Sequence, residues 1–279
     1  MKETLKELRD TLTPLYGKGE TEAIIRLIFH HLKGWNLTEM LIHGEDELSP
    51  FIKNQIQKIL QRLIKFEPIQ YITGEARFHG MNLKIKPGVL IPRPETDELT
   101  DIIIKENEDK EDLKVLDLCT GSGCIAIALK RNLKFPDVTA LDISQKAIEV
   151  AEENASDLKA KINFVKDDIF KWIPEDKFDI IVSNPPYVDK SEGKDMDKNV
   201  LNYEPAEAIF VSDKNPLSFY ERIAEIAKSS LNADGSLYLE INPRHSRELK
   251  EMLEEKGFKN INVVLDSFGK KRFIKCSIN

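Results

Sequence analysis

The residues Ser183-Asn184-Pro185-Pro186-Tyr187 combine groups that could hold a flat amide or amino nitrogen. Asn184 offers a side-chain carbonyl, Pro185 offers a backbone carbonyl, and Tyr187 offers an aromatic face. A planar NH2 group has two hydrogens and needs two acceptors. The pattern therefore indicates chemistry at an amide or exocyclic amino nitrogen, although a strand-ending turn with a buried tyrosine would use the same residues.

The position of this turn in the chain favours a ligand site. The apolar run 178–182 leads directly into it and predicts a buried strand. Pro185 must end that strand, because proline has no N–H for a sheet ladder, and two successive prolines keep the turn extended. In open α/β sheets, ligands bind at the carboxyl ends of the strands.

A second candidate site lies at residues 117–124, Asp-Leu-Cys-Thr-Gly-Ser-Gly-Cys, after another apolar run. Its glycines let the backbone approach a ligand closely, and a helix that begins here can receive a carboxylate at its N-terminus. The pattern is neither G-x-G-x-x-G nor a P-loop, so a diphosphate is not favoured. We expect a cofactor loop made of Cys119, Thr120, Gly121, Ser122 and Gly123.

Acidic residues end the next two predicted strands. Asp142 follows Gly123 by 19 residues, a position where an acid typically accepts hydrogen bonds from ribose hydroxyls. Asp168 could take the amino group of adenine, with Ile169 packed on the ring. Ribose and adenine acceptors without a phosphate cradle indicate S-adenosylmethionine, which Asn184 would border from the neighbouring strand.

Strands and helices alternate from residue 113 onward, which predicts an α/β fold with a mostly parallel sheet covered on both faces. The last two strands are expected to be antiparallel, because only a short link joins them. The predicted strands are Leu113–Leu118, Val138–Leu141, Ile162–Val165, Phe178–Val182, Leu237–Ile241, Ile261–Leu265 and Arg272–Cys276.

The front of the chain has a different pattern. Residues 1–74 contain short amphipathic stripes that predict a small helical bundle, with a break at Thr13-Pro14 and a helix start at Ser49-Pro50. Residues 75–90 predict a β-hairpin linker around Gly80. Residues 91–279 form the predicted catalytic domain, in which Thr96 is expected to cap a helix that begins near residue 97.

Composition excludes several classes of protein. The 279 residues carry a net charge of −7, which disfavours a broad nucleic-acid surface. Residues 1–90 have 13 Lys and Arg against 11 Asp and Glu, so the front is mildly basic and the rest carries −9. Three cysteines and scattered histidines predict neither disulfides nor a metal site. No apolar run predicts a membrane span or a signal peptide, so a cytoplasmic protein is expected.

The motifs at 117–123, at Asp142 and at 184–187 together resemble class I methyltransferases that modify planar nitrogens. Two upstream stretches, Pro68–Gly74 and Ile91–Thr96, narrow the likeness to the HemK-type release factor glutamine N5-methyltransferases. Further similarity lies at 202–205, 218–220 and 239–241, so the resemblance covers nearly the whole chain.

This resemblance implies a Rossmann-like domain with a seven-stranded sheet and S-adenosylmethionine as the methyl donor. The implied substrate is the glutamine of the Gly-Gly-Gln tripeptide in peptide-chain release factors. Asn184 and Pro185 would hold the amide, with Pro186 and Tyr187 completing the pocket. Three residues depart from the family pattern: Cys119 replaces a glycine, Asp97 replaces a glutamate, and Asn242 stands where a glycine often follows Ile241.

Other functions remain open at this stage. Glutamine methylation of a ribosomal protein would use identical amide chemistry. Methylation of a DNA or RNA base would require a flipped-out nucleotide. The acidic net charge of the chain counts against a nucleic-acid substrate. A non-catalytic cofactor-binding adaptor would not need the intact turn at 184–187. Residues 1–74 are expected to dock the substrate protein, with a purely structural role as the alternative.

Overall fold

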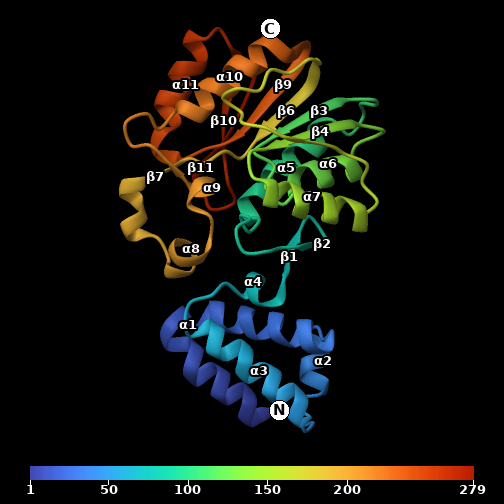
Figure 1. Cartoon of the computed structure of the whole chain (residues 1–279), viewed down its shortest axis with the longest axis vertical. Helices are drawn as coiled ribbons and strands as arrows, with labels where there is room; N and C mark the ends of the chain where they lie inside the picture. The colour runs from blue at the N-terminus through green and yellow to red at the C-terminus, as the bar shows by residue number, and fades with distance from the viewer. The chain divides into compact units, whose positions relative to one another are not determined.

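In the described part of the chain, seven strands form one sheet in the order β10-β11-β9-β6-β3-β4-β5 (Figure 1). The computed structural model describes residues 1–279, apart from the side chain of Asp195. Neighbours pair in parallel from β9 to β5, whereas β11 is antiparallel to both β9 and β10. The strands are β3 (Lys114–Leu118), β4 (Asp137–Asp142), β5 (Asn163–Lys166), β6 (Phe178–Ser183), β9 (Leu231–Glu240), β10 (Lys259–Leu265) and β11 (Lys271–Ser277). The predicted α/β fold and its antiparallel end are confirmed.

Helices cover both faces of this sheet, and each face has its own hydrophobic core. Successive side chains of a strand point to opposite faces, so Ile180 and Val182 pack into one core and Ile181 into the other. The first core receives α5 (Pro94–Glu106), α6 (Cys124–Asn132) and α7 (Gln145–Asp157); the second receives α10 (Ser218–Ser230) and α11 (Ser246–Glu255) (Figure 1). Burial on both faces explains why the strands read as continuous apolar runs.

The chain divides into two compact units. Residues Met1–Glu75 with Asp197–Tyr203 make the first, and Ala76–Met196 with Glu204–Asn279 make the second. The first unit contains α1 (Lys2–Lys33), α2 (Leu37–Ile42), α3 (Pro50–Leu63), α4 (Ile69–Thr73) and α8 (Lys198–Tyr203). In this unit the Tyr203 hydroxyl donates to the Lys65 carbonyl at 2.9 Å, so a segment from the second half of the sequence belongs to the helical unit.

Local sequence signals set several ends of these helices. The Ser49 side chain accepts the backbone N–H of Ile52 at 3.3 Å, as predicted for a cap, and Gly34 ends α1 in the left-handed conformation. The predicted break at Pro14 is wrong: α1 continues through it and leaves helical geometry at Gly17, where φ is 76° and ψ is 164°. Proline removes one hydrogen bond but has a helical φ, whereas glycine can adopt the positive φ that the bend requires.

The hairpin β1 (Glu75–Phe78) and β2 (Met81–Lys84) packs on the sheet unit. His79 and Gly80 both have positive φ, as a two-residue hairpin turn requires. The Asn154 side chain on α7 accepts the Lys84 backbone N–H at 2.7 Å and donates to the Lys84 carbonyl at 3.1 Å. It also donates to the Ser122 carbonyl at 3.0 Å, so one asparagine fastens both the hairpin and the predicted cofactor loop.

The segments after β6 and after β9 form short elements that the sequence did not predict. They are β7 (Val188–Asp189), the 3-10 helix η1 (Lys190–Asp195), α9 (Ala206–Ile209), β8 (Phe210–Val211) and the 3-10 helix η2 (Pro243–His245). β7 pairs in parallel with β8. Each element is too short for a periodic pattern to reveal it. Among the described residues, no helix combines the length and the apolar character needed to cross a membrane.

Gly123 offers a test of how tightly α6 packs on α7. Gly123→Ala is expected to lower the free energy of unfolding by about 1–3 kcal/mol, because a Cβ there would lie 3.0 Å from the Cβ of Ala151. Gly121→Ala is the matched control: it also has positive φ, but no atom lies within 4 Å of its new Cβ. Urea unfolding followed by circular dichroism measures both, and equal losses would contradict the packing role.

Candidate active site

A pocket lies at the carboxyl ends of the parallel strands and encloses about 790 Å³, open solvent included. The sequence-predicted residues that line it are Cys119, Gly121, Asp142, Asp168, Ile169, Asn184 and Pro186. They come from the ends of β3, β4, β5 and β6, which parallel pairing places at one edge of the sheet.

The other predicted loop residues lie behind the pocket surface. Thr120, Ser122 and Gly123 are buried. The Thr120 hydroxyl donates to Asp117 Oδ2 at 2.6 Å, and the Ala126 backbone N–H donates to the same oxygen at 3.2 Å. Burial raises the pKa of Asp117 to about 7. This aspartate therefore ties the loop and the start of α6 to β3.

Cys119 occupies a backbone conformation that favours glycine. Its φ is 64°, in the left-handed region that few other residues adopt easily. A glycine would adopt this conformation without strain. Burial raises the pKa of the Cys119 thiol, so the side chain presents a neutral S–H to the pocket.

Asp142 braces the loop as well as facing the pocket. Its Oδ2 accepts the Gly121 backbone N–H at 2.8 Å, and its Oδ1 accepts the Ser144 backbone N–H at 2.9 Å. Burial raises the pKa of Asp142, and these backbone donors oppose that shift. The same carboxylate thus sets the loop conformation and contributes negative charge to the cavity.

Apolar walls complete the pocket, and sequence reasoning missed most of them. Ile143 and Phe170 line it although both are exposed to solvent, and the Phe170 and Phe219 rings meet edge to face at 5.0 Å. A local signal was present, because Ile143 and Phe170 each follow a strand-end acid within two residues.

Two motifs noted in the sequence meet beside the pocket. The buried carboxylate of Glu204 accepts the Ile91 backbone N–H at 3.0 Å and pairs with the Arg93 guanidinium at 2.5 Å. The residues that follow, Pro205, Glu207 and Ala208, line the cavity. The ion pair therefore anchors one wall of the pocket to the extended segment that precedes α5.

The Asn184 side chain is held by a chain of hydrogen bonds. Its Nδ2 donates to the Thr96 hydroxyl at 3.1 Å, and that hydroxyl donates to Glu240 Oε2 at 2.7 Å. The Tyr187 hydroxyl donates to Glu240 Oε1 at 3.0 Å. The prediction that Thr96 caps a helix is wrong: α5 begins at Pro94, and Thr96 is buried in its first turn and faces Glu240. Sequence reasoning also gave Glu240 no role.

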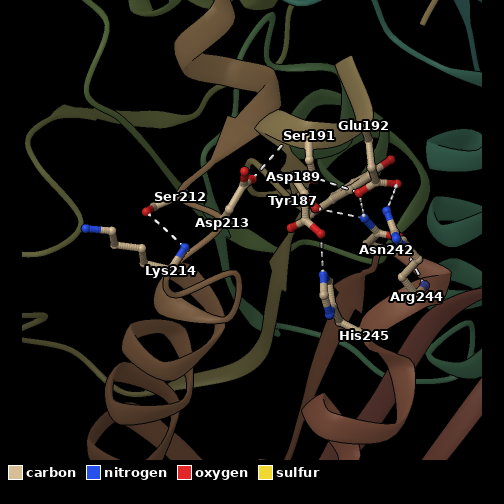
Figure 2. Close-up of polar contacts among 10 residues, drawn as sticks. All are labelled: Tyr187, Asp189, Ser191, Glu192, Ser212, Asp213, Lys214, Asn242, Arg244 and His245. Atoms are coloured by element: carbon tan, nitrogen blue, oxygen red, sulfur yellow. Dashed lines mark hydrogen bonds and ion pairs between the residues drawn. The ribbon is translucent and has the colours of Figure 1, made fainter. Parts of the chain in front are cut away.

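A second polar network fixes the backbone just beyond Tyr187. Figure 2 shows Asn242 between two partners: its Nδ2 donates to the Tyr187 carbonyl at 3.1 Å and to Glu192 Oε1 at 2.8 Å. His245 Nε2 contacts Asp189 Oδ2 at 2.9 Å in the same view. The Asn242 side chain therefore holds the backbone at Tyr187 and the side chain of Glu192 together.

Comparison with known proteins supports the family resemblance noted in the sequence. Residues 3–74 match the model described as PrmC N-terminal domain, and residues 80–204 match the Methyltransferase small domain. A Release factor glutamine methyltransferase from Bacteroides thetaiotaomicron is 42% identical over 96% of both chains. One from Flavobacterium psychrophilum is 41% identical over 95% of this chain and 94% of its own.

A solved structure shows the same fold. It is the 16S rRNA N2 G1207 methyltransferase RsmC of Thermus thermophilus in complex with AdoMet and guanosine, with a TM-score of 0.54 and 20% identity. The match covers 74% of this chain and 50% of that one. The class I methyltransferase fold is therefore confirmed.

Asn242→Ala is expected to speed hydrogen exchange of the backbone amides at 187–192, because it removes the bonds to the Tyr187 carbonyl and to Glu192. Arg244→Ala is the matched control, since the Arg244 side chain is exposed and lies 3.7 Å from Glu192. Mass spectrometry of the exchanged peptides measures both. Unchanged exchange in Asn242→Ala would show that the turn is held by other contacts.

Proposed function

This chain belongs to the release factor glutamine methyltransferase family, and we propose that it methylates nitrogen N5 of the glutamine in the Gly-Gly-Gln tripeptide of peptide-chain release factors, with S-adenosylmethionine as the methyl donor. The main support for this proposal is that Asn184 lines the pocket while its Nδ2 donates to the Thr96 hydroxyl. That geometry leaves its oxygen for a substrate amide. The proposed reaction takes place in the cytoplasm.

The chemistry of the pocket fits S-adenosylmethionine. Asp142 and Asp168 are placed to accept hydrogen bonds from ribose hydroxyls and from the adenine amino group, and Ile169 and Phe170 offer apolar surface for the ring. Gly121 would border the methionine part. When bound, this cofactor supplies a sulfonium methyl group that is already strongly electrophilic.

The proposed task of the protein is alignment of a poor nucleophile. An amide lone pair is delocalised into its carbonyl, so geometry must compensate, and correct placement can contribute roughly 7–11 kcal/mol. Asn184 Oδ1 and the Pro185 carbonyl would each accept one hydrogen of the glutamine NH2 group. Among the described hydrogen bonds, none engages the Pro185 carbonyl, and Pro185 itself is buried.

Both acceptors would favour the transition state over the ground state. As the amide nitrogen attacks, it gains positive charge, and its two hydrogens bind the Asn184 and Pro185 oxygens more strongly. An N-methylated amide cation is very acidic, so its proton can leave to water without a dedicated base. Burial also raises the pKa of Tyr187, which makes its hydroxyl a hydrogen-bond donor rather than a base.

We further propose that the helical unit docks the release factor. A glutamine side chain alone offers too little surface to select one protein, so contacts away from the chemistry must supply discrimination. The unit exposes an apolar group on α2 and at the start of α3: Leu41 is 75% exposed, Ile42 69% and Phe51 66%. The net charge gives this surface no bias, because residues 1–74 carry ten Lys and Arg against ten Asp and Glu.

Asn184→Ala and Asp142→Ala test the site as a reciprocal pair. Asn184→Ala should lower turnover by about 10²–10³ while cofactor affinity is kept, because it removes a contact that strengthens in the transition state. Asp142→Ala should weaken cofactor binding by about tenfold or more. Methylation assays with a release factor, a ribosomal protein and an oligonucleotide, together with calorimetry, measure both. Full turnover in Asn184→Ala, or methylation of the oligonucleotide instead, would refute the proposal.

The docking surface is tested in the full chain with Leu41→Ser combined with Ile42→Ser. We expect kcat/KM for a whole release factor to fall about tenfold, since buried apolar anchors carry much of an interface's energy. Activity on a short Gly-Gly-Gln peptide should be unchanged. Leu265→Ser, at an exposed leucine of the sheet unit, is the control. Equal activity of the double variant on both substrates would leave the helical unit a structural role only.

A further inference from the structure

Glu240 is a buried acid that the mechanism above does not use. It lies at the end of β9 and is 1% exposed. Its two oxygens accept the hydroxyl hydrogens of Thr96 and Tyr187, at 2.7 Å and 3.0 Å. A buried carboxylate is costly unless its oxygens are satisfied, so an acid retained beside a catalytic turn needs an explanation beyond stability.

The direction of these bonds decides which way the Asn184 amide faces. A hydroxyl group has one hydrogen and two lone pairs. Because the Thr96 hydrogen is given to Glu240, the Thr96 oxygen can only accept on its other side. It therefore receives Asn184 Nδ2, at 3.1 Å, and Asn184 Oδ1 is left as the atom that the substrate meets.

We propose that Glu240, acting through Thr96, is the positioning residue that makes this site select an amide over a carboxylate. The inference rests on the proposed glutamine methylation and adds the origin of its substrate specificity. An ionised Glu240 is a pure acceptor, so it fixes the hydrogen-bond direction along Thr96 and Asn184. A carboxylate substrate would meet two oxygens and no donor at this point, whereas an amide gives each oxygen a hydrogen.

A neutral group at position 240 would remove this constraint. It could donate to the Thr96 oxygen, Thr96 could donate to Asn184 Oδ1, and the asparagine would then present its NH2 group to the pocket. Such a site would repel the substrate amide hydrogens and attract a carboxylate. The groups that face Glu240 are Thr96, Tyr187, Tyr220, Arg272 and Glu95.

These neighbours oppose one another in their effect on Glu240. Burial raises the pKa of its carboxyl, and Glu95 adds to that shift, while the hydroxyl donors and the charge of Arg272 lower it. Burial has the largest effect, so the pKa of Glu240 stays above its usual value, while the hydroxyl donors and Arg272 favour the ionised form on which the hydrogen-bond direction depends. Tyr220 binds the Glu240 backbone carbonyl at 3.0 Å and holds the end of the strand.

The test compares Gly-Gly-Gln and Gly-Gly-Glu peptides in the wild type and in Glu240→Gln, a variant of the same shape whose amide can donate. We expect kcat/KM for the Gly-Gly-Gln peptide to fall about 10- to 100-fold, the range for one hydrogen bond to a charged group. In Glu240→Gln, the Gly-Gly-Glu peptide should become a stronger inhibitor, compared with the affinity of the same variant for the Gly-Gly-Gln peptide. Cofactor affinity, measured by calorimetry, should stay the same.

Thr96 supplies a second, independent pair of variants. Thr96→Val keeps the shape of the side chain but breaks the hydrogen-bond chain from Glu240 to Asn184. Its preference for the Gly-Gly-Gln peptide over Gly-Gly-Glu should therefore weaken as in Glu240→Gln. Thr96→Ser keeps the hydroxyl and should recover the preference that Thr96→Val loses. This rescue separates orientation of Asn184 from a general loss of packing, and it decides the question if Glu240→Gln does not fold.

The outcomes are distinguishable. An unchanged preference for Gly-Gly-Gln over Gly-Gly-Glu in a folded Glu240→Gln, or in Thr96→Val, would overturn the role of Glu240 and leave the proposed function standing. A wild-type chain that methylates neither the peptide nor a release factor would overturn the proposed function and this inference together.

Discussion

Parallel pairing of β3, β4, β5 and β6 is the constraint on which the site depends. Parallel strands end at the same edge, so the residues that follow them are brought together although they are spread over more than sixty positions of sequence. Cys119, Asp142, Asp168 and Asn184 each follow or end one of these strands, and all line one pocket. The helices on both faces bury the strands and keep that edge rigid.

Around this edge, a few buried polar side chains connect segments that are far apart in sequence. Asn154 joins the hairpin to the loop at 119–123, Glu204 joins the segment at 91–93 to the pocket wall, and Glu240 joins α5 to the turn at 184–187. Each of these side chains has its donors and acceptors paired with specific partner atoms. Such networks give a unique arrangement, because any slip leaves a buried polar atom unpaired.

In the proposed mechanism, specificity and reactivity depend on the same few atoms of this site. The oxygen of Asn184 is useful only if the nitrogen of the same amide is held elsewhere, and the protein arranges this from behind the pocket. The turn itself is supported on its other side by Asn242, which donates to the Tyr187 carbonyl. In the proposed mechanism the substrate would meet two fixed acceptors, and little reorganisation would be needed when charge develops on the amide nitrogen.

The sequence by itself determined the parts of this protein that depend on local chemistry. The apolar runs predicted the seven strands, the prolines predicted the turn at 184–187, and the strand-end acids predicted a pocket for a nucleoside-like cofactor. Even small caps such as Ser49 followed from neighbouring residues. These signals are readable because the cause and the effect lie within a few positions of each other.

Only the tertiary structure decided which distant side chains meet. Thr96 has the residue type of a helix cap, but its partner Glu240 lies 144 positions away, and no local pattern indicates that contact. The apolar walls at Ile143 and Phe170, and the placement of residues 197–203 in the helical unit, depend in the same way on packing across the fold. A bond between distant residues is set by how the layers stack, which the order of residues along one element does not specify.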